Sequence, residues 1–211
     1  MFMNKDQNLI NEFAIKTLKE NLNVMYAQIW REGQLTAEYK RMPVKTRLNT
    51  WSACKGVVSC AAGIALDEGL IRLDEKIVDI FPEYAPENPE GYLGDVTLEN
   101  MLTMTTGLES SLFFCDWPER YTTPDWIRYF FENAKVIKKP GTEWLYSNFN
   151  TYMISCAIEK RAGVNLLEYL RNRFFELLGI GNPDWTLCPK GHVHAANGLY
   201  VNIDEFTRYG Q

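Results

Sequence analysis

The sequence predicts an α+β fold in which a helical domain is inserted into an antiparallel sheet domain. Three observations support this fold. An N-terminal helix precedes two strands, mostly helical periodicity runs from residue 52 to 181, and a strand and a helix follow near residue 200. We expect residues 1–50 to form the first part of the sheet domain, residues 51–197 the helical insert, and residues 198–211 the start of a return segment.

The N-terminal elements follow from apolar spacing and one turn. Residues 24–30 read as a strand, residues 31–34 as a hairpin turn and residues 35–39 as the returning strand. The residues before them have the three- and four-residue apolar spacing of an amphipathic helix over 6–20. The chain should therefore begin with a helix and a hairpin.

Glycines, prolines and helix caps divide the central stretch into helices. The run 57–66 is apolar almost all round, which predicts a buried helix that ends at Gly69. Thr97 is the expected cap of a short helix. Pro124, which follows Thr123, is expected at the first helical position of another.

Two more helices and a strand complete the predicted elements. Residues 150–162 and 166–178 should be helical, because each apolar pattern is followed directly by a glycine. Residues 198–201 read as a strand. Asn202, with Glu205 three residues later, has the form of a capping box for a last helix.

Composition and charge exclude several classes of function. The chain is 46% hydrophobic and 23% charged, which is ordinary for a globular protein. A net charge of −5 argues against a nucleic-acid partner, since phosphate binding requires clustered Lys and Arg. We find no signal-peptide core and no apolar stretch of membrane-spanning length. We therefore expect no membrane partner and a cytoplasmic location, with a removed leader as the alternative.

The five cysteines are an odd number and are scattered among apolar neighbours, which favours free thiols over a disulfide framework. Cys188, His192 and His194 are close enough in sequence to suggest zinc, but we find no convincing fourth ligand beside them. We expect them to be ordinary loop residues, with no metal bound. Cys54 is either a reactive thiol or a small residue packed in the core. The apolar run after it favours packing.

The tetrapeptide Ser52-Ala53-Cys54-Lys55 carries the sharpest chemical signal. It stands at the start of the buried helix, and residues three apart on a helix share a face, so the Lys55 amine can reach the Ser52 hydroxyl. A hydroxyl becomes a good nucleophile when a neighbouring base takes its proton. The helix N-terminus adds backbone N–H groups that favour a developing oxyanion. A serine cap beside a solvated lysine is the alternative.

The tripeptide Tyr146-Ser147-Asn148 offers a second base and a substrate contact. A phenol has a pKa near 10, and it can serve as a base where a neighbouring lysine favours the phenolate. The asparagine amide provides both a donor and an acceptor for a substrate amide. A buried tyrosine followed by a turn is the alternative. Tyr200-Val201-Asn202 has the same form, and there we expect Asn202 to be a helix cap.

Several segments, in order along the chain, resemble the beta-lactamase-like, penicillin-recognising family of serine hydrolases. Residues 52–55 and the small-residue apolar helix after them resemble its nucleophile helix. Residues 97–108 are similar to its Leu-Leu-Thr-His-Thr-Ser-Gly-Leu segment, with Met104 at the His position. Residues 140–148 look like its Tyr-x-Asn element.

Two later segments extend the resemblance. Residues 177–180 are similar to the family's Pro-Leu-Gly-Met, with Leu177 in place of Pro, and residues 198–210 resemble the segment that follows. Tyr146 at the second catalytic element points to the branch that holds class C beta-lactamases, esterases and D-aminopeptidases. The resemblance implies a beta-lactamase/transpeptidase-like fold, with its sheet incomplete in this chain.

The same resemblance implies a mechanism and a set of site residues. Ser52 would be acylated, Lys55 and Tyr146 would share the general-base role, and Asn148 would hold the substrate carbonyl. The implied activity is hydrolysis through a covalent acyl-enzyme, with no metal or organic cofactor. The implied partner is a small-molecule substrate, either a beta-lactam, a small ester or a D-amino-acid peptide.

One family element is missing from the sequence, the Lys-Thr-Gly or His-x-Gly strand that supplies an oxyanion donor. The tripeptide Thr105-Thr106-Gly107 lies before a loop in a different element. Loss of one such donor costs roughly 10²–10³ in rate in other hydrolases. A non-catalytic relative or inactive fragment that keeps the fold as a binding module is therefore the alternative function. The open edge of the hairpin should favour self-association or completion by another chain.

Overall fold

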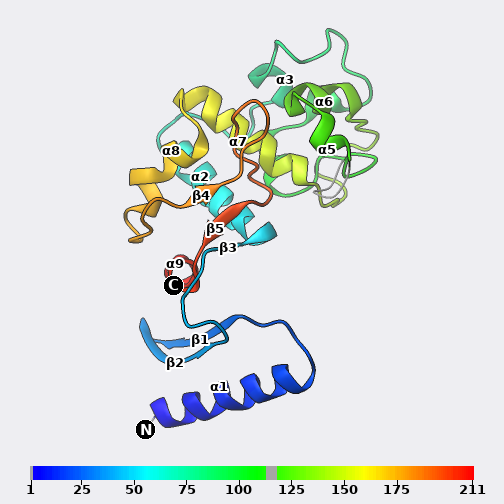
Figure 1. Cartoon of the computed structure of the whole chain (residues 1–211). Coiled ribbons are helices and arrows are strands. Elements are labelled where there is room, and N and C mark those ends of the chain that lie inside the picture. Colours follow the sequence, from blue (N-terminus) through cyan, green and yellow to red (C-terminus); the bar gives the residue numbers. More distant parts are fainter. Residues whose placement is uncertain (1, 113–117) are drawn as a thin grey trace.

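The structure is a computed structural model that describes residues 2–112 and 118–211, arranged as a helix–hairpin unit and a larger helical part (Figure 1). In the unit, α1 packs mainly against the second strand of a two-stranded antiparallel sheet. Within the described chain, β1 pairs with β2 alone. The elements of this unit are α1 (Phe2–Lys19), β1 (Tyr26–Arg31) and β2 (Gln34–Lys40). The predicted helix and hairpin are therefore confirmed.

A buried carboxylate fastens α1 to the hairpin. The oxygens of Asp6 accept hydrogen bonds from Nε and Nη2 of Arg31, each at 2.7 Å, and from the Thr36 hydroxyl at 2.7 Å. The hydrogen bonds from Arg31 and then Thr36 lower the pKa of Asp6 to about 2. The carboxylate therefore stays ionised at neutral pH, and it joins the helix to both strands.

The core of the larger part lies between α2 (Cys54–Asp67) and α7 (Asn148–Ala162), which pack against each other. Helix α2 buries small side chains, including Ala61 and Ala65, and these permit close approach. Helix α7 is buried at every position from Phe149 to Glu159. It ends at Gly163, whose φ of 73° is in the left-handed region, so the predicted stop is confirmed.

Short helices surround this pair. Thr97 and Asn100 form a capping box at the start of α4, which confirms the predicted cap. Helix α6 is capped by Asp125, whose side chain accepts a hydrogen bond from the Arg128 amide. The surrounding elements are α3 (Ile77–Ile80), the 3₁₀ turn η2 (Leu93–Asp95), α4 (Leu98–Leu102), α5 (Glu119–Thr122) and α6 (Trp126–Asn133).

A small three-stranded antiparallel sheet connects segments that lie far apart in the sequence. Its strand order is β3–β5–β4, so the predicted strand near residue 200 lies in the middle. The flanking strands have two residues each, and the sequence did not predict them. The capping box of Asn202 and Glu205 then starts α9, as predicted. The elements are β3 (Leu48–Asn49), β4 (Asp184–Trp185), β5 (Leu199–Val201) and α9 (Ile203–Gly210).

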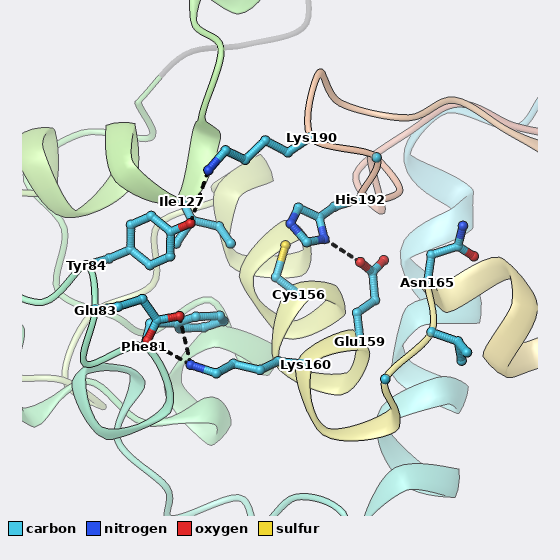
Figure 2. Close-up of a pocket in the computed structure, with 13 residues that line it drawn as sticks. Phe81, Glu83, Tyr84, Ile127, Cys156, Glu159, Lys160, Asn165, Lys190 and His192 are labelled. Carbon is cyan, nitrogen blue, oxygen red and sulfur yellow. Dashed lines mark hydrogen bonds and ion pairs between the residues drawn. The ribbon is translucent and has the colours of Figure 1, made fainter.

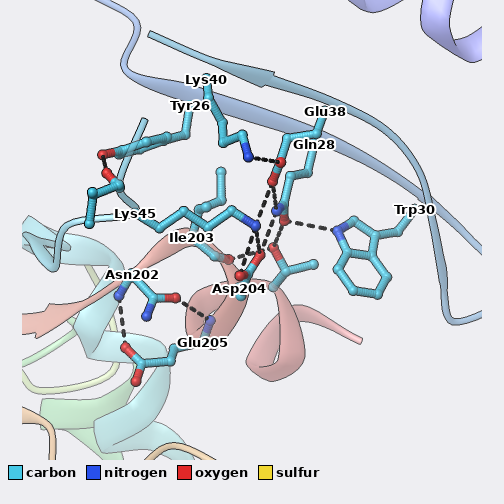
Figure 3. A network of polar contacts seen from close by, with 12 residues as sticks. Tyr26, Gln28, Trp30, Glu38, Lys40, Lys45, Asn202, Ile203, Asp204 and Glu205 are labelled. Atoms are coloured by element: carbon cyan, nitrogen blue, oxygen red, sulfur yellow. Dashed lines mark hydrogen bonds and ion pairs between the residues drawn. The ribbon is translucent and has the colours of Figure 1, made fainter. Parts of the chain in front are cut away.

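A polar network joins the hairpin to α9 (Figure 3). The Gln28 amide donates to Glu38 at 2.7 Å and to Asp204 at 2.6 Å. Lys45 reaches the same two carboxylates, at 2.7 Å from Glu38 and 2.8 Å from Asp204. The Thr207 hydroxyl donates to Gln28 at 2.9 Å. The helix–hairpin unit is thus bridged to α9 by hydrogen bonds and ion pairs.

Two predicted elements differ in the structure. Helix α6 begins at Trp126, so Pro124 precedes the cap and is not the first helical residue, because Asp125 satisfies the free amides instead. The predicted helix 166–178 divides into α8 (Leu166–Leu170), a π-helical turn η3 (Arg171–Phe175) and further turns. No helix in the described ranges is long and apolar enough to cross a bilayer.

Gly107 is a position where the backbone requires glycine. Its φ is 78°, and a Cβ there would overlap the carbonyl oxygen of Lys138. Gly33 has a similar φ of 75°, but no heavy atom lies within 4 Å of a Cβ placed there. We expect Gly107→Ala to lower the free energy of unfolding by about 3 kcal/mol and Gly33→Ala by about 1 kcal/mol, because only the first adds a clash to the strain. Urea denaturation measures both, and equal losses would show that the close approach has no cost.

Candidate active site

The sequence around Ser52 is fixed by hydrogen bonds to β5 and to the turn before it. The Thr50 amide donates to the Leu199 carbonyl at 2.9 Å. The Asn49 side-chain oxygen accepts from the amides of Trp51 at 2.9 Å and Gly198 at 3.0 Å. Ser52 lies in the 3₁₀ turn η1 (Trp51–Ala53), which leads directly into α2. The nucleophile candidate therefore stands at a helix start, as the sequence predicts.

The structure brings three predicted site residues together. The Ser52 Oγ lies 2.7 Å from the Tyr146 hydroxyl, although the two residues are 94 positions apart. The Lys55 Nζ lies 3.1 Å from the Ser52 Oγ and 5.0 Å from the centre of the Tyr146 ring. The serine hydroxyl therefore lies within hydrogen-bonding distance of two groups that can act as a base, a lysine amine and a phenol.

The fourth predicted residue, Asn148, is the first residue of α7 and directly follows Ser147. Its side-chain oxygen is buried and has no hydrogen-bond partner among the described residues. A buried acceptor without a partner costs about 1–3 kcal/mol. The residue as a whole is partly exposed, and its role as a substrate contact stays a prediction.

A turn that the sequence did not predict holds the lysine. The Ala196 carbonyl accepts a hydrogen bond from Lys55 Nζ at 2.7 Å, and the Ala195 carbonyl accepts one from Cys54 Sγ at 3.3 Å. Ala195 has a φ of 58°, which aims these adjacent carbonyls at the start of α2. Burial raises the pKa of the Cys54 thiol to about 12, so a packed thiol fits this position better than a reactive one.

The three residues weighed as zinc ligands have separate partners. The His192 Nδ1 lies 2.5 Å from a Glu159 oxygen, inside a pocket of about 460 Å³ (Figure 2). His194 contacts other groups, and the Cys188 sulfur accepts a hydrogen bond from Tyr152 at 3.3 Å. In the part of the chain that the structure describes, no group of three His, Cys, Asp or Glu side chains could hold a metal ion.

His194 is a buried histidine beside the turn that holds Lys55. Its Nδ1 lies 2.8 Å from Arg120 Nη2 and 3.0 Å from the Asn197 side-chain oxygen, and its ring lies 4.7 Å from that of Trp126. Burial, with a smaller contribution from the Arg120 charge, lowers the pKa of His194 from 6.5 to about 4. The ring is therefore neutral at pH 7.

The low pKa of His194 predicts a pH dependence of stability. Below pH 6.5 His194 is protonated in the unfolded chain but stays neutral in the folded chain. The free energy of unfolding therefore falls as the pH falls. We expect a loss of about 2 kcal/mol in the free energy of unfolding between pH 7 and pH 5 from this group. Urea denaturation of His194→Gln at both pH values should show a correspondingly smaller change. Equal changes in the two proteins would contradict this assignment.

Comparison with known proteins identifies the family. Residues 13–207 match the family model described as Beta-lactamase, and the chain belongs to this family. A class C beta-lactamase structure is similar over 99% of this chain and 64% of its own, with a TM-score of 0.77 and 16% identity. A beta-lactamase/D-alanine carboxypeptidase from Pseudomonas syringae covers 96% of this chain and 64% of its own, with a TM-score of 0.75 and 18% identity. The fold is therefore beta-lactamase/transpeptidase-like, as predicted.

A sequence relative adds an esterase to these neighbours. The lovastatin esterase of Penicillium rubens (strain ATCC 28089 / DSM 1075 / NRRL 1951 / Wisconsin 54-1255) is 27% identical over an alignment of 155 residues that covers 61% of this chain and 37% of the esterase. The chain thus spans less than two thirds of the length of each of these relatives. Its family contains serine hydrolases, with beta-lactamases and an esterase among the similar proteins.

Proposed function

We propose that this chain carries the nucleophile and base of a serine hydrolase that forms an acyl-enzyme on Ser52. The observation that carries the proposal is the position of the Ser52 hydroxyl, 2.7 Å from the Tyr146 hydroxyl and 3.1 Å from Lys55 Nζ. Membership of the beta-lactamase family supports the same chemistry.

In this mechanism Lys55 and Tyr146 share the general-base role. In its deprotonated form Tyr146 takes the Ser52 proton as the Oγ attacks the substrate carbonyl carbon, while Lys55 Nζ donates a hydrogen bond to the Oγ. The bond to the leaving group breaks, and Tyr146 returns the proton to the departing oxygen or nitrogen. Water then attacks the carbonyl carbon of the serine ester, and Tyr146 takes the proton of the water. Tyr146 returns this proton to the Ser52 Oγ as the ester bond breaks, which frees Ser52 and releases the acid.

The substrate would be a beta-lactam, a small ester or a D-amino-acid peptide. The exposed Ser52 at the start of α2 can be reached from solvent, and its backbone N–H would supply one oxyanion donor. Among the three classes, the relative named as an esterase favours an ester. Asn148 would hold the substrate amide or carbonyl beside the nucleophile.

The test combines labelling with turnover. A fluorophosphonate should form an adduct on Ser52, located by mass spectrometry, and the protein should hydrolyse a chromogenic ester or cephalosporin. Ser52→Ala should lose both, whereas Ser59→Ala, which changes an exposed serine on the same helix, should keep both. An adduct on Cys54 or another residue would refute the mechanism. Binding of the ligands with neither adduct nor turnover would establish the alternative, a non-catalytic binding module.

A further inference from the structure

Two tryptophans beside the candidate nucleophile are largely exposed. Trp51 directly precedes Ser52 and is 59% exposed, and Trp144 is 67% exposed. The Trp144 ring lies 6.3 Å from the Tyr146 ring at an angle of 44°. Because the Tyr146 hydroxyl lies 2.7 Å from the Ser52 Oγ, a substrate held at Ser52 lies within reach of the Trp144 ring. We call Trp51 and Trp144 the aromatic rim.

Neither local packing nor backbone geometry accounts for the aromatic rim. Trp51 has a φ of 49°, in the left-handed region that bulky side chains rarely occupy. Because the indole is mostly exposed, it gains little burial energy in the core that could offset this backbone strain. Large aromatic side chains normally bury 150–250 Å² each, so two exposed tryptophans leave apolar area that a ligand can cover.

Two charged groups close to the rim residues in sequence, Glu143 and Lys55, have partners. Glu143, next to Trp144 in sequence, forms an ion pair with Lys138. The Lys55 amine is engaged by Ser52 and by the Ala196 carbonyl. The rim therefore offers a substrate apolar surface and aromatic faces.

We propose that the aromatic rim selects an uncharged ester that carries a bulky apolar group, aromatic or long aliphatic, next to the scissile carbonyl. This inference rests on the proposed acyl-enzyme function of Ser52 and names its substrate class. Trp144 is the specificity-determining residue, because its ring contacts the tyrosine that holds the nucleophile. Trp51 contributes apolar surface on the serine side.

Two fluorophosphonates with the same phosphorus–fluorine bond test the proposal, one with an ethoxy group and one with a 2-naphthylethoxy group. The rate of Ser52 labelling is measured for each by mass spectrometry. We expect the naphthyl probe to react about tenfold faster with the natural sequence, since covering one aromatic contact is worth about a factor of ten. Trp144→Ala should remove this preference and leave ethoxy labelling within about twofold.

Two further variants separate specificity from folding. Trp144→Phe should retain part of the preference, because it keeps an aromatic face. Leu177→Ala removes another exposed apolar side chain, one that lies outside the site, and should change neither rate. Acrylamide should quench Trp144 fluorescence in the free protein and quench it less after naphthyl labelling.

The outcomes distinguish this inference from the proposed function. Equal labelling of Ser52 by both probes, in the natural sequence and in Trp144→Ala, would refute the aromatic rim and leave the hydrolase mechanism standing. A Trp144 ring that acrylamide cannot reach in the free protein would show that another segment or a second copy covers it, and would also refute the inference. Absence of labelling by either probe would refute both proposals.

Discussion

Replacing Lys55 with alanine should slow fluorophosphonate labelling of Ser52 by about 10²–10⁴-fold, the usual contribution of a positioned general base or its partner. The Lys55 Nζ lies 3.1 Å from the Ser52 Oγ and 5.0 Å from the centre of the Tyr146 ring. Its removal takes away the amine that contacts the Ser52 hydroxyl and lies beside the Tyr146 ring, so Tyr146 would have to act without its partner. The Tyr146→Phe variant should fall in the same range, because it removes the hydroxyl at 2.7 Å.

Lys55→Ala should change the rate of Ser52 labelling and leave the folding of the chain unchanged. Lys139→Ala, which removes an exposed lysine seven positions before Tyr146, is the matched control and should label at the rate of the natural sequence. Circular dichroism should show the same helix content in all variants. If Lys55→Ala labelled at an undiminished rate, Tyr146 would be the sole base, and the double variant with Tyr146→Phe would then be slow.

Replacing Glu159 with alanine should lower the free energy of unfolding by about 3–5 kcal/mol, the usual cost of breaking a buried charged network. One Glu159 oxygen accepts hydrogen bonds from the Ser155 hydroxyl at 3.1 Å, the Leu166 amide at 3.1 Å and the Val193 amide at 3.3 Å. The other lies 2.5 Å from His192 Nδ1 (Figure 2). The side chain thus joins α7 to the start of α8 and to the loop before β5.

The measurement is urea denaturation at pH 7 against Glu176→Ala, which changes an exposed glutamate and should cost less than about 0.5 kcal/mol. Glu159→Gln keeps an acceptor oxygen and should lose less than Glu159→Ala, because the two amides can still be satisfied. Similar losses for the alanine variants at positions 159 and 176 would show that water replaces the carboxylate at little cost.

Elements whose signals are local were predicted well. The Thr97 cap, the Asn202–Glu205 capping box and the stop at Gly163 each depend on residues within four positions of each other, and each is confirmed. Strands β3 and β4 were not predicted, because two residues carry no periodicity and their pairing partners lie far away in sequence. The π-helical turn after α8 was missed because its apolar spacing is the same as that of a regular helix.

The candidate site divides in the same way. Lys55 could be assigned to Ser52 from helical spacing alone, since the two residues are three positions apart. Tyr146 and Asn148 were singled out by their chemistry, but their assignment to the Ser52 site came only from the family resemblance, because no local pattern indicates that residue 146 meets residue 52. The turn at Ala195 and Ala196, and the role of Glu159, gave no sequence signal. Their contacts are formed by backbone atoms and by packing between distant segments.

The polar bridge between the hairpin and α9 has a consequence for how the molecule opens. Gln28, Lys45 and Asp204 carry that bridge, and partly exposed ion pairs of this kind weaken as salt screens them. The core between α2 and α7 is apolar and contains none of these contacts. The helix–hairpin unit can therefore detach in a sub-global opening while the catalytic helices stay packed. The amides of the unit then exchange with solvent through an opening of lower free energy than the opening that exposes the amides of α7. The difference between these two opening free energies grows with ionic strength.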